Sequence, residues 1–241
     1  MTRQSDQSQY FGRDLEVMHY AKNYYKWLLL EFKEFIGRNI VEVGAGSGTF
    51  SEIIFKEFQL DSFYAIEPSK NMYKLLQERL FVRKFKDRIF NGYLPDLYKK
   101  LVPRPDTFIY INVLEHVEDD DEELGVIYNS LKRNGHLCIF VPALRWLYAP
   151  FDKTLGHYRR YHKRELESKL NKNGFKVTKS KYFDSLGIIP WFIVFKMFQK
   201  KVLSLSDVNL YDKVAIPLLQ RVERYIKPPI GKNLLIVAQK E

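Results

Sequence analysis

The segment VEVGAGSGTF, at residues 41–50, constrains the fold of this chain more than any other feature. It places Gly44, Gly46 and Gly48 between a short apolar run and a run whose apolar residues recur at helical spacing. Glycines at a strand-to-helix turn let the backbone bend sharply and approach a ligand closely. Glu67 ends the next apolar run, 23 residues after Gly44, where a carboxylate can accept both hydroxyls of a ribose. Together these features favour a nucleotide-type cofactor site over a plain turn beside a solvated Glu67.

Short apolar runs alternate with amphipathic ones along most of the chain. The expected strands are residues 39–43, 62–66, 88–90, 106–111, 136–141, 175–182 and 234–239. The expected helices are residues 15–35 (as one or two), 49–58, 69–80, 119–131 and 163–171. This alternation predicts an α/β, Rossmann-like fold with a seven-stranded, mostly parallel sheet and helices on both faces. We expect one domain, with a helical cover at 1–38, a core at 39–182, a helical insertion or lid at 183–232 and the last strand at 233–241.

The glycine spacing distinguishes two classes of cofactor. A dinucleotide-binding loop typically reads GxGxxG, whereas here the third glycine comes one residue earlier and Glu42 stands two positions before the first. This pattern resembles the class I S-adenosylmethionine (SAM)-dependent methyltransferases. The resemblance continues in EPS at 67–69, in NVLEHV at 112–117 and in NGHL at 134–137.

The resemblance implies that SAM is the cofactor. The residues that it places around SAM are Glu42, Gly44, Ala45, Gly46, Gly48, Glu67, Pro68, Met72, Gly92, Tyr93, Asn112 and Leu114. A narrower resemblance rests on VPA at 141–143, GHYRRY at 156–161 and PPIGKNL at 228–234. These segments are similar to a bacterial subgroup that is often found with enzymes modifying sugars and polyprenyl phosphates, which implies a class of acceptor rather than a substrate.

Methyl transfer from a sulfonium is an in-line displacement, and a hydroxyl acceptor also needs a base. His157 is the first candidate base, because imidazole titrates near neutral pH and the family usually builds its acceptor site after the fifth strand. His116 is the second, against the alternative of a structural residue beside the cofactor. The residues expected to contact the acceptor are Tyr148, Asp152, Tyr158, Arg159 and Arg160. Asp152 could orient a histidine or bind an amine of the acceptor, and a loop turn is the alternative. Arg159 and Arg160 could bind phosphate through their bidentate guanidinium groups, and a solvated basic pair is the alternative. The histidine spacing indicates no metal site.

The charge of the chain is uneven. Residues 145–241 carry 20 basic and 8 acidic side chains, a net charge of +12, whereas residues 1–144 carry 19 and 21, a net charge of −2. Such asymmetry indicates an anionic partner for the C-terminal part, against the alternative of a solvated basic face. Within it, residues 186–201 combine aromatic side chains with lysines, which suits either an interfacial helix on an anionic membrane or a lid packed on the core.

The sequence therefore predicts SAM-dependent methyl transfer to an oxygen or nitrogen of a small or lipid-linked acceptor that bears a sugar or phosphate. An RNA methyltransferase that uses the basic C-terminal surface is the second hypothesis, and a non-catalytic SAM-binding subunit is the third. The place after the fourth strand lacks the (D/N/S)PP(Y/F) segment of DNA amino methyltransferases, and Cys138 lies in an apolar run unsuited to cytosine C5 chemistry. The polar N-terminus lacks the apolar segment of a secretory signal, so we expect a cytoplasmic protein, at the inner membrane surface if residues 186–201 contact lipid.

Overall fold

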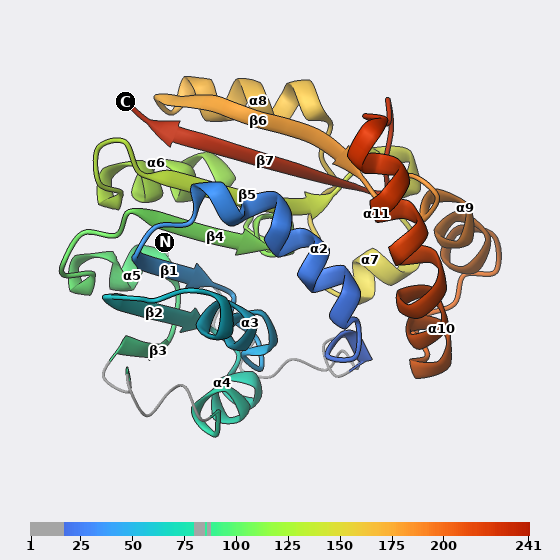
Figure 1. Ribbon diagram of the computed structural model, residues 1–241, viewed down its shortest axis with the longest axis horizontal. Coiled ribbons are helices and arrows are strands. Elements are labelled where there is room, and N and C mark those ends of the chain that lie inside the picture. The colour runs from blue at the N-terminus through green and yellow to red at the C-terminus, as the bar shows by residue number, and fades with distance from the viewer. Residues whose placement is uncertain (1–16, 80–84, 86–87) are drawn as a thin grey trace.

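The computed structural model describes residues 17–79, 85 and 88–241. Within these residues lies one sheet of seven strands (Figure 1). The strands are β1 (Asn39–Val43), β2 (Ser62–Glu67), β3 (Ile89–Asn91), β4 (Thr107–Ile111), β5 (His136–Pro142), β6 (Phe175–Phe183) and β7 (Asn233–Lys240). They follow the order β3-β2-β1-β4-β5-β7-β6, and β7 runs antiparallel to both of its neighbours. The predicted α/β fold with a mostly parallel sheet is therefore confirmed.

Helices separate most of the strands along the chain. The α-helices are α2 (Lys22–Phe32), α3 (Thr49–Glu57), α4 (Lys70–Gln77), α5 (Leu94–Leu97), α6 (Asp120–Ser130), α7 (Pro150–Thr154), α8 (Lys163–Lys172), α9 (Ile188–Trp191), α10 (Leu205–Leu210) and α11 (Ile216–Tyr225). Short 3-10 turns are η1 (Lys33–Phe35), η4 (Tyr98–Lys100), η5 (Leu114–His116) and η6 (Arg145–Leu147), and two π-helical turns are η7 (Phe192–Met197) and η8 (Tyr211–Ala215).

Two apolar layers hold the sheet between helices. Alternate strand residues point to opposite faces, so Ile40 joins one layer while its neighbour Val41 joins the other. Helices α2, α3, α4 and α11 contribute to the first layer, and α5, α6 and α8 to the second. Cys138 is buried in β5 within the first layer, and burial raises the pKa of its thiol. Because helices cover both faces of the sheet, we expect a ligand to bind at the ends of the strands.

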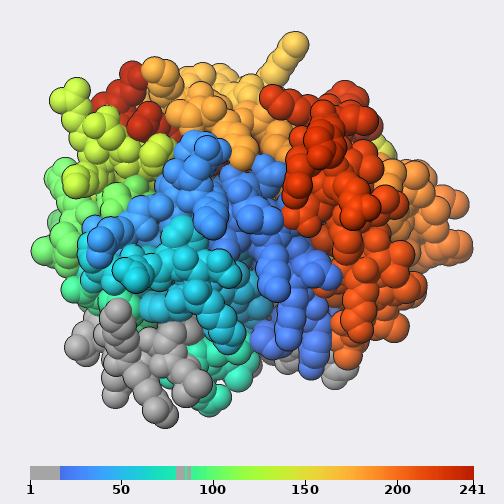
Figure 2. All heavy atoms as spheres, viewed as in Figure 1, coloured from blue at the N-terminus to red at the C-terminus, as the bar shows by residue number. Residues whose placement is uncertain are grey.

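The N-terminal cover and the insertion between β6 and β7 lie side by side (Figures 1 and 2). No side chain at the start of α2 caps that helix. Instead Asp212, from η8, accepts hydrogen bonds from the backbone N–H groups of Asn23 at 3.1 Å and Tyr24 at 2.8 Å. A carboxylate at a helix N-terminus satisfies its free donors and complements its dipole. The insertion is thus joined to the cover through this cap, at the end of the sheet toward which the parallel strands point.

Local differences from the sequence prediction concern short elements and one helix face. The structure adds the short helices α5 and α7, which contain too few residues to show a hydrophobic period. The helical spacing that predicts a helix at 69–80 also places Met72, Leu75, Leu76 and Leu80 on its inward face. The structure forms this helix as α4, but Leu75 is 41% exposed instead of buried, and Leu80 lies outside the described residues. In the part of the chain that the structure describes, no helix combines the length and the apolar character that crossing a bilayer requires.

Candidate active site

The glycine loop connects β1 to α3 and is built on three left-handed residues. Gly44, Gly46 and Gly48 have φ angles of 67°, 56° and 80°. The N–H of Gly44 donates to the carbonyl of Ile66 in β2 at 2.8 Å, which holds the loop against the end of the neighbouring strand. A Cβ atom on Gly44 would lie 2.3 Å from Cγ2 of Val113. Glycine is therefore required here both by backbone conformation and by the close approach of the segment after β4.

Glu67 ends β2 and its carboxylate spans the glycine loop and the start of α4. Oε2 accepts from the N–H of Gly46 at 2.7 Å and Oε1 from the N–H of Ser69 at 2.8 Å. Burial raises the pKa of Glu67, while these two backbone hydrogen bonds act to lower it. The predicted ribose-binding acid thus lies in direct contact with the glycine loop, and its binding of a ribose stays a prediction.

Glu42 lies beneath the loop and is turned toward α3. Its Oε2 accepts a hydrogen bond from the Ser51 hydroxyl, and the side chain is almost fully buried. Burial, together with the nearby charge of Glu67, raises the pKa of Glu42 from its ordinary value of 4.5 to about 8, against the opposing effect of the Ser51 hydrogen bond. Ala45, in the loop itself, is also buried. Contact of Glu42 with a cofactor stays a prediction, and its visible role is to hold α3 against β1.

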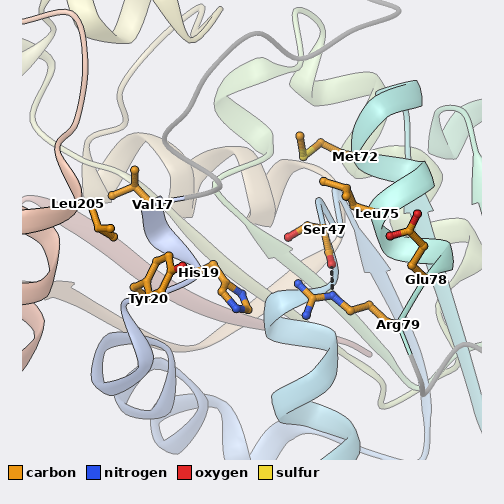
Figure 3. Close-up of a pocket in the computed structure, with 9 residues that line it drawn as sticks. All are labelled: Val17, His19, Tyr20, Ser47, Met72, Leu75, Glu78, Arg79 and Leu205. Carbon is orange, nitrogen blue, oxygen red and sulfur yellow. Dashed lines mark hydrogen bonds between the residues drawn. The ribbon is translucent and has the colours of Figure 1, made fainter.

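An open cleft of about 600 Å³ borders the glycine loop. Figure 3 shows its lining: Val17, His19, Tyr20, Ser47, Met72, Leu75, Glu78, Arg79 and Leu205. Nε of Arg79 donates to the carbonyl of Ser47 at 2.7 Å and so fixes the loop to the segment after α4. Of the predicted cofactor residues, Met72 therefore faces this cleft. Ser47 lies within the glycine loop but was not predicted as a lining residue. Arg79 was not predicted either, because nothing in the sequence brings it to the loop.

The remaining predicted cofactor residues lie at the ends of neighbouring strands. Gly92 follows β3, and its N–H donates to the Glu67 carbonyl at 3.3 Å. Tyr93, next to it, is exposed, and Pro68 is partly buried. Asn112 follows β4 with a φ of 51° and is exposed, whereas Leu114 is fully buried. The structure thus arranges these residues along one edge of the sheet, from β3 across β2 and β1 to β4.

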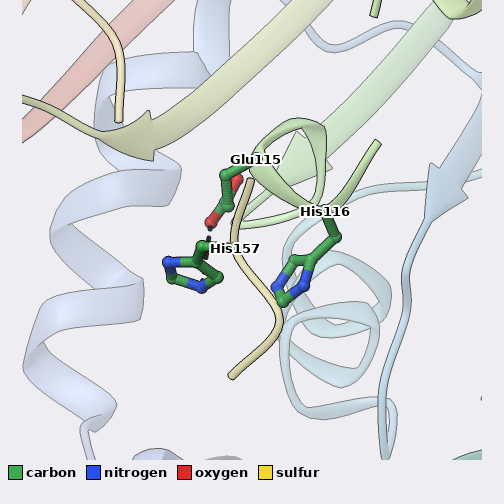
Figure 4. A group of neighbouring side chains, drawn as sticks. All are labelled: Glu115, His116 and His157. Atoms are coloured by element: carbon green, nitrogen blue, oxygen red, sulfur yellow. Dashed lines mark ion pairs between the residues drawn. The ribbon is translucent and has the colours of Figure 1, made fainter. Parts of the chain in front are cut away.

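Glu115, His116 and His157 form a cluster at the same edge (Figure 4), and one ligand atom of each lies within 4.8 Å of the others. The two imidazoles meet edge to face, with their centroids 4.6 Å apart. Burial raises the pKa of Glu115 to about 7, although His157 opposes this shift. Burial, and then His157, lower the pKa of His116 to about 3, so His116 is neutral at physiological pH. Both histidines were predicted as candidate bases, but the contact between them was not.

Asp152, on α7, links His157 to Arg160. Its Oδ1 lies 3.0 Å from Nδ1 of His157 and accepts from Nε of Arg160 at 2.9 Å, while Oδ2 accepts from the N–H of Ala149. Burial acts to raise the pKa of Asp152, but these partners hold it below its ordinary value. The sequence left open whether Asp152 orients a histidine or contacts the acceptor. Because the side chain is fully buried and its oxygens are occupied, the structure favours the first role.

Arg160 is one of the two arginines predicted to bind phosphate. Its side chain is buried, and its guanidinium lies 4.5 Å from the centre of the Trp191 ring while donating to the Ala143 carbonyl at 3.2 Å. A buried guanidinium enclosed by Asp152, a carbonyl and an indole is poorly placed to bind a phosphate, so contact of Arg160 with the acceptor stays a prediction that this environment does not favour. Arg160 pairs with Asp152 and thereby connects α7 to α9.

The other predicted acceptor residues lie nearer the surface. Arg159 is partly exposed, with NH1 3.2 Å from Oδ2 of Asp120 and NH2 donating to the Glu118 carbonyl. The hydroxyl of Tyr148 donates to the carbonyl of His157 at 2.7 Å, and Tyr158 is 49% exposed. Arg159 is thus an ion-paired residue and not a solvated one, and Tyr148 supports the loop that carries His157.

Comparison with known proteins bears on this site. The sequence profile of a methyltransferase domain family matches residues 17–180. A comparison with curated proteins found no significant match. Among solved structures, the chain is similar to a SAM-dependent methyltransferase from Archaeoglobus fulgidus, with 18% identity and a TM-score of 0.63 over 94% of this chain and 99% of that one. It is also similar to phosphoethanolamine N-methyltransferase 2 from Haemonchus contortus, with 16% identity and a TM-score of 0.63 over 100% of this chain and 61% of that one.

The profile match extends from the N-terminal cover through the core to β6, and so includes the glycine loop, Glu67 and the Glu115–His116–His157 cluster. Both structural likenesses lie below 25% identity and show a shared fold. Because the profile matches more than half of the sequence, this chain belongs to the methyltransferase domain family.

Proposed function

We propose that the protein transfers a methyl group from SAM to an oxygen or nitrogen of a small or lipid-linked acceptor that bears a sugar or phosphate. The observation that carries this proposal is the cradle of Gly46, Glu67 and Ser69, in which a carboxylate at the end of β2 meets the backbone of a left-handed glycine loop. Such a carboxylate can exchange these amide contacts for the two hydroxyls of a ribose. The neighbouring cleft, with Met72 on one wall, is the space proposed for the adenine.

The acceptor would lie on the far side of the cofactor, where the segments after β4 and β5 meet. Nδ1 of His157 is held by Asp152, which leaves Nε2 as the nitrogen able to take a proton from an acceptor hydroxyl. His116 is the second candidate for this role, and burial, which lowers its pKa to about 3, makes it a weak base. The cofactor supplies the leaving group, so the protein has only to orient the acceptor and accept this proton.

Two observations support an acceptor that carries phosphate and lipid. The Haemonchus contortus protein, which shares this fold, was solved with phosphomonomethylethanolamine, a phosphate-bearing amine. In the present chain, the segment 186–201 exposes apolar side chains beside three lysines. The exposed members are Leu186, Ile189, Phe192, Ile193, Met197 and Phe198, with Lys196, Lys200 and Lys201. Aromatic and aliphatic side chains beside lysines suit contact with an anionic membrane surface.

Methyl transfer from labelled SAM into a cell extract tests the proposal. Label in the butanol phase supports a lipid-linked acceptor, and label in the small aqueous fraction supports a soluble one. Label in RNA would instead promote the alternative in which the basic C-terminal surface binds nucleic acid. SAM binding without any turnover would favour a non-catalytic subunit. The Glu67→Ala variant is the background control for every fraction.

Co-sedimentation with vesicles tests the membrane contact separately. We expect binding to vesicles containing phosphatidylglycerol and weaker binding to phosphatidylcholine vesicles, since lysines add an electrostatic attraction. Phe192→Ser combined with Phe198→Ser should reduce the bound fraction. Tyr225→Ser, which changes an exposed aromatic residue on α11, is the matched control. Equal binding of the double variant and the control would argue for a lid in place of a membrane anchor.

A further inference from the structure

The carboxylate of Glu115 is fully buried, and among the residues that the structure describes neither of its oxygens has a hydrogen-bond partner in another residue. Nε2 of His157 lies 4.0 Å from Oε1 of this carboxylate. This distance is too long for a hydrogen bond. Buried carboxylates in proteins are normally paired, hydrogen-bonded or bound to a metal, because removing them from water is costly. Glu115 therefore requires a compensating group that the protein's own side chains do not supply by direct contact.

Two imidazoles face the same space as Glu115 (Figure 4). Nδ1 of His157 is bound to the buried carboxylate of Asp152, so Nε2 is the nitrogen directed at Glu115. The His116 ring interacts with the backbone of Gly156. An imidazole whose second nitrogen is held by a carboxylate or a carbonyl is the usual arrangement of a metal-binding histidine, since the outer partner fixes the ring and its tautomer. The cluster thus has both a set of donor atoms and the supports behind them.

We propose that Glu115, His116 and His157 bind one divalent first-row transition metal ion, with Asp152 as the outer partner of His157. Two imidazoles and one carboxylate are a ligand set used for Zn²⁺ and related ions, with one or more coordination positions left open. Bonds of about 2.1 Å place tetrahedral ligands about 3.4 Å apart. The donor atoms lie within 4.8 Å of one another, so side-chain rotations of about 1 Å bring them onto one ion.

The place of this cluster in the sheet gives the ion a role that rests on the proposed function. Glu115 and His116 follow β4 and His157 follows β5, on the acceptor side of the glycine loop. An open position there would bind a hydroxyl oxygen of the acceptor and lower its pKa, so that its proton is released to water. The oxygen would then attack the methyl group, and the bond from that methyl group to the sulfur of SAM would break as the new C–O bond forms. A His157 whose Nε2 binds the ion cannot also remove a proton through that atom. The metal site therefore replaces the role of His157 as a base, and the two assignments are mutually exclusive.

Titration of the chelator-treated, full-length protein with Co²⁺ tests the site without any activity assay. We expect one Co²⁺ per chain, with visible absorption bands that Zn²⁺ abolishes by competition. Glu115→Gln and His116→Ala should each weaken Co²⁺ binding by at least about 10-fold, because changes even to outer partners of metal ligands cost about 10- to 100-fold in affinity. His162→Ala, which removes an exposed histidine outside the cluster, should leave the affinity unchanged. Circular dichroism confirms that each variant is folded.

Absence of stoichiometric Co²⁺ binding, or equal affinity in the folded Glu115→Gln, His116→Ala and wild-type proteins, would overturn the metal site. SAM affinity, measured by calorimetry on the same samples, separates this result from the proposed function. If the metal-free protein binds SAM and transfers methyl groups at the full rate, methyl transfer stands and the proposed role of the ion in it fails. If Co²⁺ binds as expected but no acceptor is ever labelled, the metal site stands and the proposed function fails.

Discussion

Glu42 provides a quantitative test of how the fold tolerates a buried acid. Its pKa lies near 8 in the folded protein and near its ordinary 4.5 in the unfolded chain, chiefly because of burial. The folded state therefore binds the proton more tightly, and the free energy of unfolding falls as the pH rises from about 4.5 and levels off above about 8. Each pH unit in this window lowers the free energy of unfolding by about 1.4 kcal/mol. Between pH 4.5 and pH 8, ionisation of Glu42 therefore lowers the free energy of unfolding by about 5 kcal/mol.

The Glu42→Gln substitution removes the titratable carboxyl group but keeps an oxygen that can accept the hydrogen bond from the Ser51 hydroxyl. We expect the variant and the wild type to have similar stability near pH 4.5, and the variant to be more stable by about 5 kcal/mol at pH 9. Urea unfolding followed by far-UV circular dichroism at pH 5, 6, 7, 8 and 9 measures this difference, and groups common to both proteins cancel. Parallel curves for the two proteins across this range would show that Glu42 is ionised in the folded state and refute the reasoning.

Three further changes test the site and its supports. Glu67→Ala should weaken SAM binding by at least about 10-fold, because hydrogen bonds to a charged group contribute about 1.5–3 kcal/mol each; unchanged affinity in calorimetry would remove Glu67 from the cofactor site. Gly44→Ala should lower the free energy of unfolding by at least about 1–2 kcal/mol, from the left-handed backbone and the contact with Val113. Gly125→Ala is the control within α6 and should not lower the free energy of unfolding, because a Cβ atom there would lie 3.7 Å from Oδ1 of Asn173, an ordinary contact distance. Equal urea midpoints for the Gly44→Ala and Gly125→Ala variants would contradict this reasoning. Arg160→Met should cost about 3–5 kcal/mol, since it leaves the Asp152 carboxylate buried without its cation; wild-type stability would show that the pair is dispensable.

The sheet was predictable because each strand is a short apolar run bounded by a turn, and because alternation with helices indicates parallel pairing. Strand β7 lies between β5 and β6 and runs antiparallel to both. Its direction depends on the path of the insertion that precedes it, and no local sequence pattern predicts that path. Leu75 shows the limit of periodicity. Its spacing matches that of Met72 and Leu76, but the cleft beside the glycine loop leaves that side of α4 uncovered.

The candidate site was predictable where one motif contains both partners or where a strand end fixes the position. The glycine loop and Glu67 belong to this class, since adjacent parallel strands bring their ends together. Arg160 does not belong to this class, because the local sequence GHYRRY does not determine whether its arginine side chains face the solvent or Asp152. Glu115 belongs to the NVLEHV segment, but nothing in that segment predicts it as a site residue. Its significance comes from its burial and from His157, which is 42 positions away in the sequence.

The topology explains why the two halves of the site face each other. The strand order runs from β1 to β2 and β3 on one side and from β1 to β4 and β5 on the other, so the chain reverses direction across the sheet between β1 and β4. Crevices at such a point are where open α/β sheets bind their ligands. Glu67 lies on the β2 side and Glu115 on the β4 side, with the glycine loop between them. Val113, two residues before Glu115, lies so close to Gly44 that the glycine loop and the Glu115–His116–His157 cluster share one wall. A substitution that moves this wall should therefore disturb cofactor and metal binding together, whereas Glu67→Ala should affect the first alone and Glu115→Gln the second alone.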